Sequence, residues 1–127
     1  MSERPHSNLD VWKKAIKLVI SVYKLTTQYP PEEKYGLVSQ MRRATVSIPS
    51  NIAEGVARKT TKEYIQFLYI SRGSLSELDT HLEISQQIGY INSEQYKDMI
   101  DEMDEISRML SGLIKALEKR LGSREKG

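Results

Sequence analysis

The side chains that most often perform chemistry in helical proteins are scarce in this chain. It contains two histidines, His6 and His81, and no cysteine. A di-metal site in a helical bundle requires a Glu-x-x-His motif on each of two helices, together with two further glutamates. Glu77 precedes His81 by four residues instead of three. The sequence therefore predicts no metal site.

Nucleophilic catalysis has equally little support. A serine nucleophile needs a neighbouring base, and the two histidines offer no such context. The stretch "RGSLSE" contains a single glycine, Gly73, and does not match a phosphate-binding loop. We expect Gly73 to allow close helix packing or the approach of a partner. No catalytic residue and no cofactor are predicted, and the chain is not expected to be an enzyme.

Basic side chains give the main hint of a function. Residues 1–62 hold eleven Lys and Arg against five Asp and Glu, whereas residues 63–127 hold eight against twelve. This imbalance fits a nucleic-acid surface, but solvated faces, internal ion pairs or subunit contacts would also explain it. No motif for reading a duplex groove is present, so any binding would depend on phosphates and on salt. The candidate residues are Lys13, Lys14, Lys17, Lys24, Arg42, Lys59 and Lys62.

Polar residues on the second predicted helix form another pattern, which we call the polar seam. From Arg43 to Arg58 they recur at steps of four, four, three and four, the spacing of one helix face. An antiparallel third helix would face this stripe and place Arg58 between Glu54 and Glu63. We expect a network that fixes helix register or a subunit contact, with a ligand or nucleic-acid role as the alternative. The seam comprises Arg43, Asn51, Glu54, Arg58, Glu63, Ser74 and Glu77.

Four segments have the apolar spacing that is typical of amphipathic helices, and none alternates like a strand. They begin near Leu9, Gly36, Thr60 and Asn92. Short connections between four helices favour an all-α, antiparallel up-down-up-down bundle. We expect this bundle to span residues 8–121, between a flexible tail at residues 1–7 and another at residues 122–127.

Local signals refine these helices. Capping boxes are predicted at three helix starts, from Ser7 and Asp10, Thr60 and Glu63, and Asn92 and Gln95. The core-facing stripe of the first helix is expected to be Leu9, Trp12, Ile16, Val19 and Tyr23. The second helix contains Pro49, which removes a backbone hydrogen bond and favours a kink. Apolar residues keep helical spacing through Pro49, so we predict a bent but continuous helix.

Apolar side chains on the first and third helices exceed what one buried stripe needs. The first helix adds Ala15, Ile20 and Val22, and the third adds Ile65, Phe67, Tyr69 and Ile70. We therefore expect a homo-oligomer. No segment approaches the ~20 apolar residues of a membrane span, and the first ten residues have no apolar signal region. A cytoplasmic protein without a membrane partner is expected.

A long stretch from Gln40 to Ile91 resembles one known family. Its hallmark is the run "SIPSNIAEG" (Ser47–Gly55), followed by Arg58, the run "GSLSE" (Gly73–Glu77) and the later "GYI" (Gly89–Ile91). These motifs are similar to those of the 23S rRNA intervening-sequence protein family, a family of four-helix bundles. The resemblance covers about residues 8–120.

The resemblance implies a small helical bundle without known catalytic activity, associated with insertions in large-subunit ribosomal RNA genes. The chain is also similar to the accessory proteins of diversity-generating retroelements. Those are basic bundles that assemble into pentameric rings and bind a reverse transcriptase and nucleic acid. Two functions are therefore expected as alternatives. One is binding of structured RNA through the basic surfaces of a homo-oligomer, for which the resemblance implies a pentamer; the other is a scaffold for an acidic protein partner or a reverse transcriptase.

Overall fold

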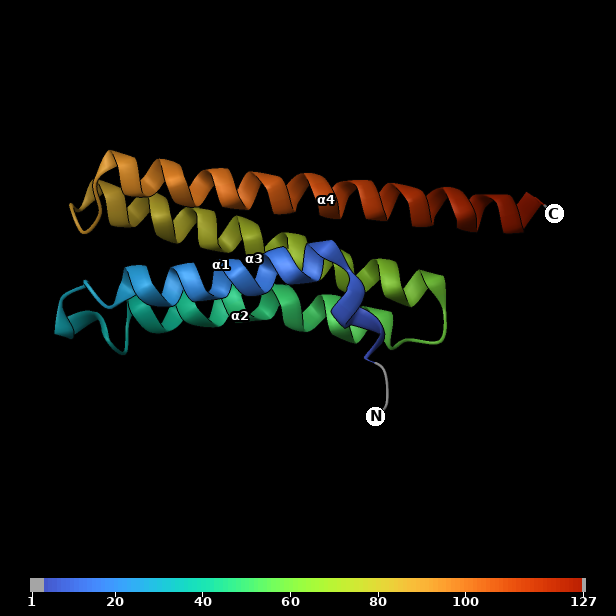
Figure 1. Ribbon diagram of the computed structural model, residues 1–127, viewed down its shortest axis with the longest axis horizontal. Coiled ribbons are helices and arrows are strands. Elements are labelled where there is room, and N and C mark those ends of the chain that lie inside the picture. Colours follow the sequence, from blue (N-terminus) through green and yellow to red (C-terminus); the bar gives the residue numbers. More distant parts are fainter. Residues whose placement is uncertain (1–3, 127) are drawn as a thin grey trace.

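The structure, a computed structural model, describes residues 4–126. Its elements are the α-helices α1 (Asp10–Thr26), α2 (Leu37–Val56), α3 (Thr61–Gln87) and α4 (Ser93–Lys126), with the short 3-10 helices η1 (Pro5–Asn8) and η2 (Pro31–Glu33). No strand occurs within residues 4–126, so the predicted all-α class is confirmed (Figure 1). No described helix is both long enough and apolar enough to cross a membrane.

The helices pack side by side along their lengths (Figure 1). α1 and α3 each contact both α2 and α4 but not each other, so they occupy diagonal corners of the bundle. Consecutive helices run in opposite directions in Figure 1. The α2–α3 turn, η1 and the C-terminal part of α4 therefore lie toward one end, and the other two connections lie at the opposite end.

The buried stripe of α1 differs from the predicted one. The residues that face the core are Val11, Ala15, Leu18, Val22 and Leu25. Ile16 and Tyr23 are exposed, so the prediction that they face the core is wrong. Because α1 carries apolar residues on two faces, the spacing alone does not identify the face that the other helices cover.

Each of the other three helices buries a stripe of apolar side chains in the core. Fully buried residues from each include Ile48 of α2, Leu78 of α3 and Leu110 of α4. Burying one such aliphatic side chain stabilises a fold by about 1.5–3 kcal/mol. This core fixes the positions from which the polar side chains project.

α2 continues through Pro49 as one helix. Side chains near the proline supply hydrogen bonds to the backbone of this region. Ser50 Oγ donates to the Val46 carbonyl at 2.8 Å, and Ser71 Oγ donates from α3 to the Ile48 carbonyl at 2.8 Å. The helix is continuous as predicted, while the bend at Pro49 stays a prediction.

Of the three predicted capping boxes, the one at Asn92 is complete and the one at Thr60 is formed in part, because the Glu63 carboxylate accepts from the Thr60 hydroxyl. Glu63 N donates to Thr60 Oγ1 at 3.1 Å, and Gln95 N donates to Asn92 Oδ1 at 2.8 Å. The predicted box at Ser7 is wrong, because Ser7 belongs to η1 and its hydroxyl donates to the Arg4 carbonyl at 2.7 Å. Leu9 is the N-cap of α1 and provides no side-chain hydrogen bond.

Both expected tails include helical structure. The end of the first tail, at residues 5–7, lies in η1, where the His6 ring packs tilted against that of Trp12, with the ring centres 5.0 Å apart. In the second, residues 122–126 continue α4 without a break. Residues 1–3 and 127, which complete the two predicted tails, lie outside the described residues.

Candidate nucleic-acid interface and polar seam

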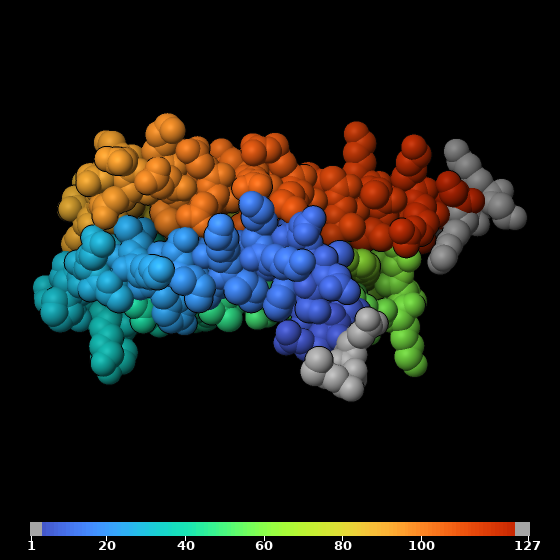
Figure 2. All heavy atoms as spheres, in the orientation of Figure 1, coloured from blue at the N-terminus to red at the C-terminus, as the bar shows by residue number. Residues whose placement is uncertain are grey.

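The lysines of α1 border a shallow groove between α1 and α4, and Figure 2 shows these two helices meeting along one face. One cavity of about 370 Å³ is lined by Lys13, Lys14 and Lys17 from α1 and by Glu105 and Met109 from α4, among others. A neighbouring cavity of about 210 Å³ adds Ser21 and Glu102. The wall from α1 is therefore basic and the facing wall from α4 is acidic.

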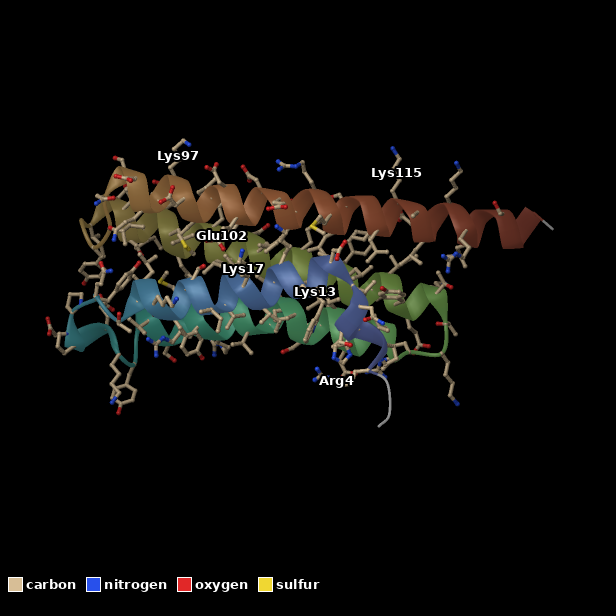
Figure 3. All side chains as sticks on the ribbon, viewed as in Figure 1. Arg4, Lys13, Lys17, Lys97, Glu102 and Lys115 are labelled. Atoms are coloured by element: carbon tan, nitrogen blue, oxygen red, sulfur yellow. The ribbon has the colours of Figure 1, made fainter. Side chains whose placement is uncertain are left out.

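Polar contacts close part of this groove. Lys14 Nζ lies 3.1 Å from Glu105 Oε1, and Ser21 Oγ donates to Glu102 Oε1 at 3.1 Å. Lys17 projects into the same region (Figure 3) but forms no ion pair with any described residue. Lys14 is thus partly neutralised, whereas Lys13 and Lys17 keep their charges available.

Arg42 has a structural role in this fold. Its Nε donates to Thr26 Oγ1 at 3.0 Å, and its Nη2 donates to the Tyr23 carbonyl at 3.4 Å. The guanidinium also lies 4.4 Å from the centre of the Tyr23 ring. A cation in this position satisfies carbonyls at the end of a helix and interacts favourably with its dipole. Arg42 therefore ties α2 to the last turn of α1.

Lys24 lies apart from the other candidate lysines, near the opposite end of α1. It lines a cavity of about 290 Å³ with Leu25 and Gln28 of the same region and Asp98 of α4. This half of the molecule is acidic, because the segment from Glu77 to Glu105 contains nine Asp and Glu but only one Lys or Arg, Lys97. Lys24 therefore does not share a surface with Lys59 and Lys62.

Lys59 and Lys62 lie exposed at the α2–α3 turn, toward the end of the bundle where η1 and the C-terminal part of α4 are also found (Figure 1). No ion pair involves either lysine within the described chain. Tyr69 Oη donates to Glu118 Oε2 at 2.9 Å, which places this part of α4 beside the start of α3. Burial raises the pKa of Tyr64, and the nearby positive charge of Arg120 opposes that rise.

Cations from three regions distant in sequence therefore gather toward this end, which we call the basic end. It comprises Arg4, Lys13, Lys59, Lys62, Lys115, Lys119 and Arg120. Arg4 and the three cations from α4 are not among the candidates that the sequence suggested. The sequence does show that the end of α4 is basic, since only two acidic residues follow Glu105. This basic segment could be grouped with Lys59 and Lys62 only once the structure placed the last turns of α4 toward the same end as the α2–α3 turn.

The polar seam contains a compact hydrogen-bonded group between α2 and α3. Ser47 Oγ and Ser74 Oγ lie 2.8 Å apart. Asn51 Nδ2 donates to the Ser47 carbonyl at 2.8 Å and to Ser47 Oγ at 2.9 Å. Close approach of the helices depends on Gly55, where a Cβ atom would lie 2.9 Å from Tyr64 Cδ1 and 3.0 Å from Phe67 Cβ.

The remaining members of the seam form separate pairs. Arg58 Nη2 lies 3.2 Å from Glu54 Oε2 and forms no ion pair with Glu63. Glu63 instead accepts a hydrogen bond from the Thr60 hydroxyl at 2.9 Å. The predicted position of Arg58 between two glutamates is therefore wrong, because the N-cap of α3 already engages Glu63.

A third group surrounds the buried side chain of His81. Its Nε2 lies 3.7 Å from Glu77 Oε2, and its Nδ1 has no hydrogen-bond partner among the described residues. Burial lowers the pKa of His81; the Glu77 carboxylate opposes this and the charge of Arg43 adds to it. His81 is accordingly a neutral core residue near neutral pH. No group of three or more potential metal-ligating side chains occurs within residues 4–126.

Comparisons with known proteins agree with this architecture. The sequence profile of the 23S rRNA-intervening sequence protein family matches residues 7–112. Among solved structures, the chain is similar to a protein of unknown function from the S23 ribosomal protein family of Bacteroides thetaiotaomicron. The two share 24% identity with a TM-score of 0.77, over 83% of this chain and 98% of the other. No curated protein matches the chain significantly. Because the profile spans most of its length, the chain belongs to the 23S rRNA-intervening sequence protein family.

Proposed function

We propose that this protein is a non-enzymatic homo-oligomer that binds structured RNA through its basic end. The observation that carries the proposal is the exposed, unpaired state of Lys59 and Lys62, which lie toward the same end of the bundle as Arg4 and the cations of α4. Grouped cations neutralise phosphates and release counterions, which gives affinity without a sequence-reading motif. The name of the family is consistent with a role close to ribosomal RNA.

The basic end is preferred to the middle of the α1–α4 groove as the principal contact surface. Glu102 and Glu105 form one wall of that groove and would repel a phosphate backbone. Lys13 of the basic end lies beside the groove, and Lys17 extends the proposed surface from it along α1. Lys14, Lys24 and Arg42 contribute less, because the first and last have partners within the chain and Lys24 lies in the acidic half.

Homo-oligomerisation is supported by exposed isoleucines on two helices, including Ile20 on α1 and Ile84 on α3. Exposed apolar groups of this kind often mark contact surfaces. A pentameric ring, as the resemblance implies, is the assembly we propose, and we place it in the cytoplasm. The alternative function is a scaffold whose basic end meets an acidic protein, such as an acidic surface of a reverse transcriptase.

Salt-titrated binding to a structured RNA hairpin separates these functions. The variants Lys59→Ala/Lys62→Ala and Lys13→Ala/Lys17→Ala should each weaken binding and reduce the salt slope by about one per phosphate contact removed. Lys97→Ala is the matched control, because Lys97 pairs with Asp101 at 3.3 Å in the acidic half. Absence of RNA binding at low salt would reject the RNA function and favour the protein scaffold.

A further inference from the structure

Two largely apolar stripes are exposed at diagonal corners of the bundle. The α1 stripe consists of Ile16, Ile20 and Tyr23, which are 38%, 50% and 40% exposed. The α3 stripe consists of Ile70, Gly73, Glu77 and Ile84, together with Ile88 at the C-cap of α3, and its isoleucines are 49%, 44% and 53% exposed. Because α1 and α3 do not touch within one chain, neither stripe covers the other intramolecularly.

Gly73 gives the α3 stripe a gap in its surface. It lies in the interior of α3, where glycine weakens a helix relative to alanine. A Cβ atom at Gly73 would meet no atom within 4 Å, so packing inside the chain does not require glycine there. Close helix packing within the chain, one of the two roles expected for Gly73, is therefore absent. The approach of a partner side chain is the other expected role, and it fits the open space at this position.

The charges around the two stripes are complementary. From Val11 to Thr26, α1 contains four lysines and no acidic residue. From Gly73 to Gln87, α3 contains Glu77, Asp79 and Glu83 but no Lys or Arg. Glu77 forms no ion pair with a lysine or arginine among the described residues; its one recorded partner is His81, at 3.7 Å. The segment of α3 that surrounds Glu77 thus favours a lysine-bearing helix as its neighbour.

The two stripes also match in height along the bundle. The Arg42 contacts place Tyr23 and Thr26 level with residue 42, so Ile20 lies about one turn away, level with Val46. The Ser47–Ser74 contact places this level of α2 beside Gly73 and Ser74. By the same helical steps, Ile16 is level with Ile70, and Lys24 is level with Glu77.

We propose that the α1 stripe of one copy packs on the α3 stripe of the next copy, in a head-to-tail contact that deepens, and rests on, the homo-oligomer proposed above. With the long axes of the copies parallel, Ile20 seats over Gly73, Ile16 packs on Ile70, and Lys24 faces Glu77. The contact joins two different surfaces and leaves one of each unpaired at the ends of any open chain of copies. It therefore continues until a ring closes.

Mixing two complementary variants tests this pairing. Ile20→Glu disables the α1 stripe, and Gly73→Leu fills the gap in the α3 stripe without a clash inside the chain. Each variant alone should have the mass of one chain, 14.6 kDa, in light scattering coupled to size exclusion at micromolar concentration. An equimolar mixture should give a heterodimer of twice that mass, because one intact surface of each kind remains. Lys97→Ala, on the outward side of α4 and outside the basic end (Figure 3), should assemble like the unmodified protein.

Each other outcome has a definite meaning. A monomeric unmodified protein would overturn the homo-oligomer itself. An oligomeric unmodified protein whose two variants keep its mass would overturn only the stripe pairing, as would dimers formed by either variant alone. Circular dichroism melts of both variants ensure that loss of assembly is not loss of folding.

A charge exchange tests the register. Lys24→Glu and Glu77→Lys should each weaken assembly about tenfold, and the combined variant should recover most of that loss, because the pair is restored with its signs reversed. If the combined variant instead shows the sum of the two single losses of assembly, the assigned register is contradicted.

Discussion

Along the α2–α3 interface, small and polar side chains let the two helices approach closely, whereas long charged side chains line the α1–α4 boundary. Gly55 leaves no room for a Cβ atom, and Ser47 bonds to Ser74 across the first interface. Lys14 meets Glu105 across the second, beside open cavities. The runs that resemble the family's hallmark, "SIPSNIAEG" and "GSLSE", supply the close contacts of the first interface. Their residues specify how α2 and α3 fit together, whereas the basic candidates on α1 lie at the second interface.

The largest expected effect comes from adding one methyl group at the close interface. Gly55→Ala would place its Cβ within 3.2 Å of Tyr64 and Phe67 atoms, including the Tyr64 carbonyl oxygen. Overpacking of this kind costs about 1–3 kcal/mol, which outweighs the ~1 kcal/mol that alanine gains over glycine in helix propensity. We expect a net loss of unfolding free energy in urea denaturation.

Gly112→Ala is the matched control for that change. Gly112 also lies inside a helix, α4, but a Cβ there would meet nothing within 4 Å. The same substitution should therefore raise the unfolding free energy, by about 0.5–1 kcal/mol. Equal effects at Gly55 and Gly112 would contradict the contrast between the two interfaces.

Hydrogen bonding across the close interface gives the next largest effect. A double-mutant cycle on Ser47→Ala and Ser74→Ala should yield a coupling energy of about 0.5–1.5 kcal/mol, because the hydroxyls lie 2.8 Å apart in a partly buried position. Denaturant titrations of the four proteins measure it. A coupling near zero would mean that solvent replaces this bond without loss.

The sequence predicts much of this fold because its strongest signals are local. Apolar spacing locates all four helices, and the pairs at Thr60 and Asn92 identify two helix starts. The buried face of α1 could not be chosen in this way, since Ile16 and Ala15 both belong to plausible stripes and only packing decides between them. Spacing predicted two partners for Glu63, Thr60 in a capping box and Arg58 across the seam, and only the structure shows that it bonds to Thr60.

Candidate-site residues were harder to predict because they depend on contacts between distant segments. The second half of the sequence is acidic on balance, but this average hides two segments of opposite charge. The segment from Glu77 to Glu105 is acidic, and the segment after it is basic. Only the antiparallel pairing of α3 with α4 brings Lys119 and Arg120 toward Lys59 and Lys62. Grouping these cations requires the lengths and directions of all four helices.

The smallest expected effect comes from the open interface. Side chains of Lys14 and Glu105 are 42% and 46% exposed, so solvent screens their 3.1 Å ion pair. A double-mutant cycle on Lys14→Ala and Glu105→Ala should give a coupling of about 0.2–0.5 kcal/mol at low salt, falling further as salt is added. Denaturation of the same four proteins at two salt concentrations measures both quantities. A coupling as large as that between Ser47 and Ser74 would mean that α1 and α4 are held as firmly as α2 and α3. The groove would then be a rigid element of the fold. Its lysines would be held by α4 and would add little to phosphate binding at the basic end.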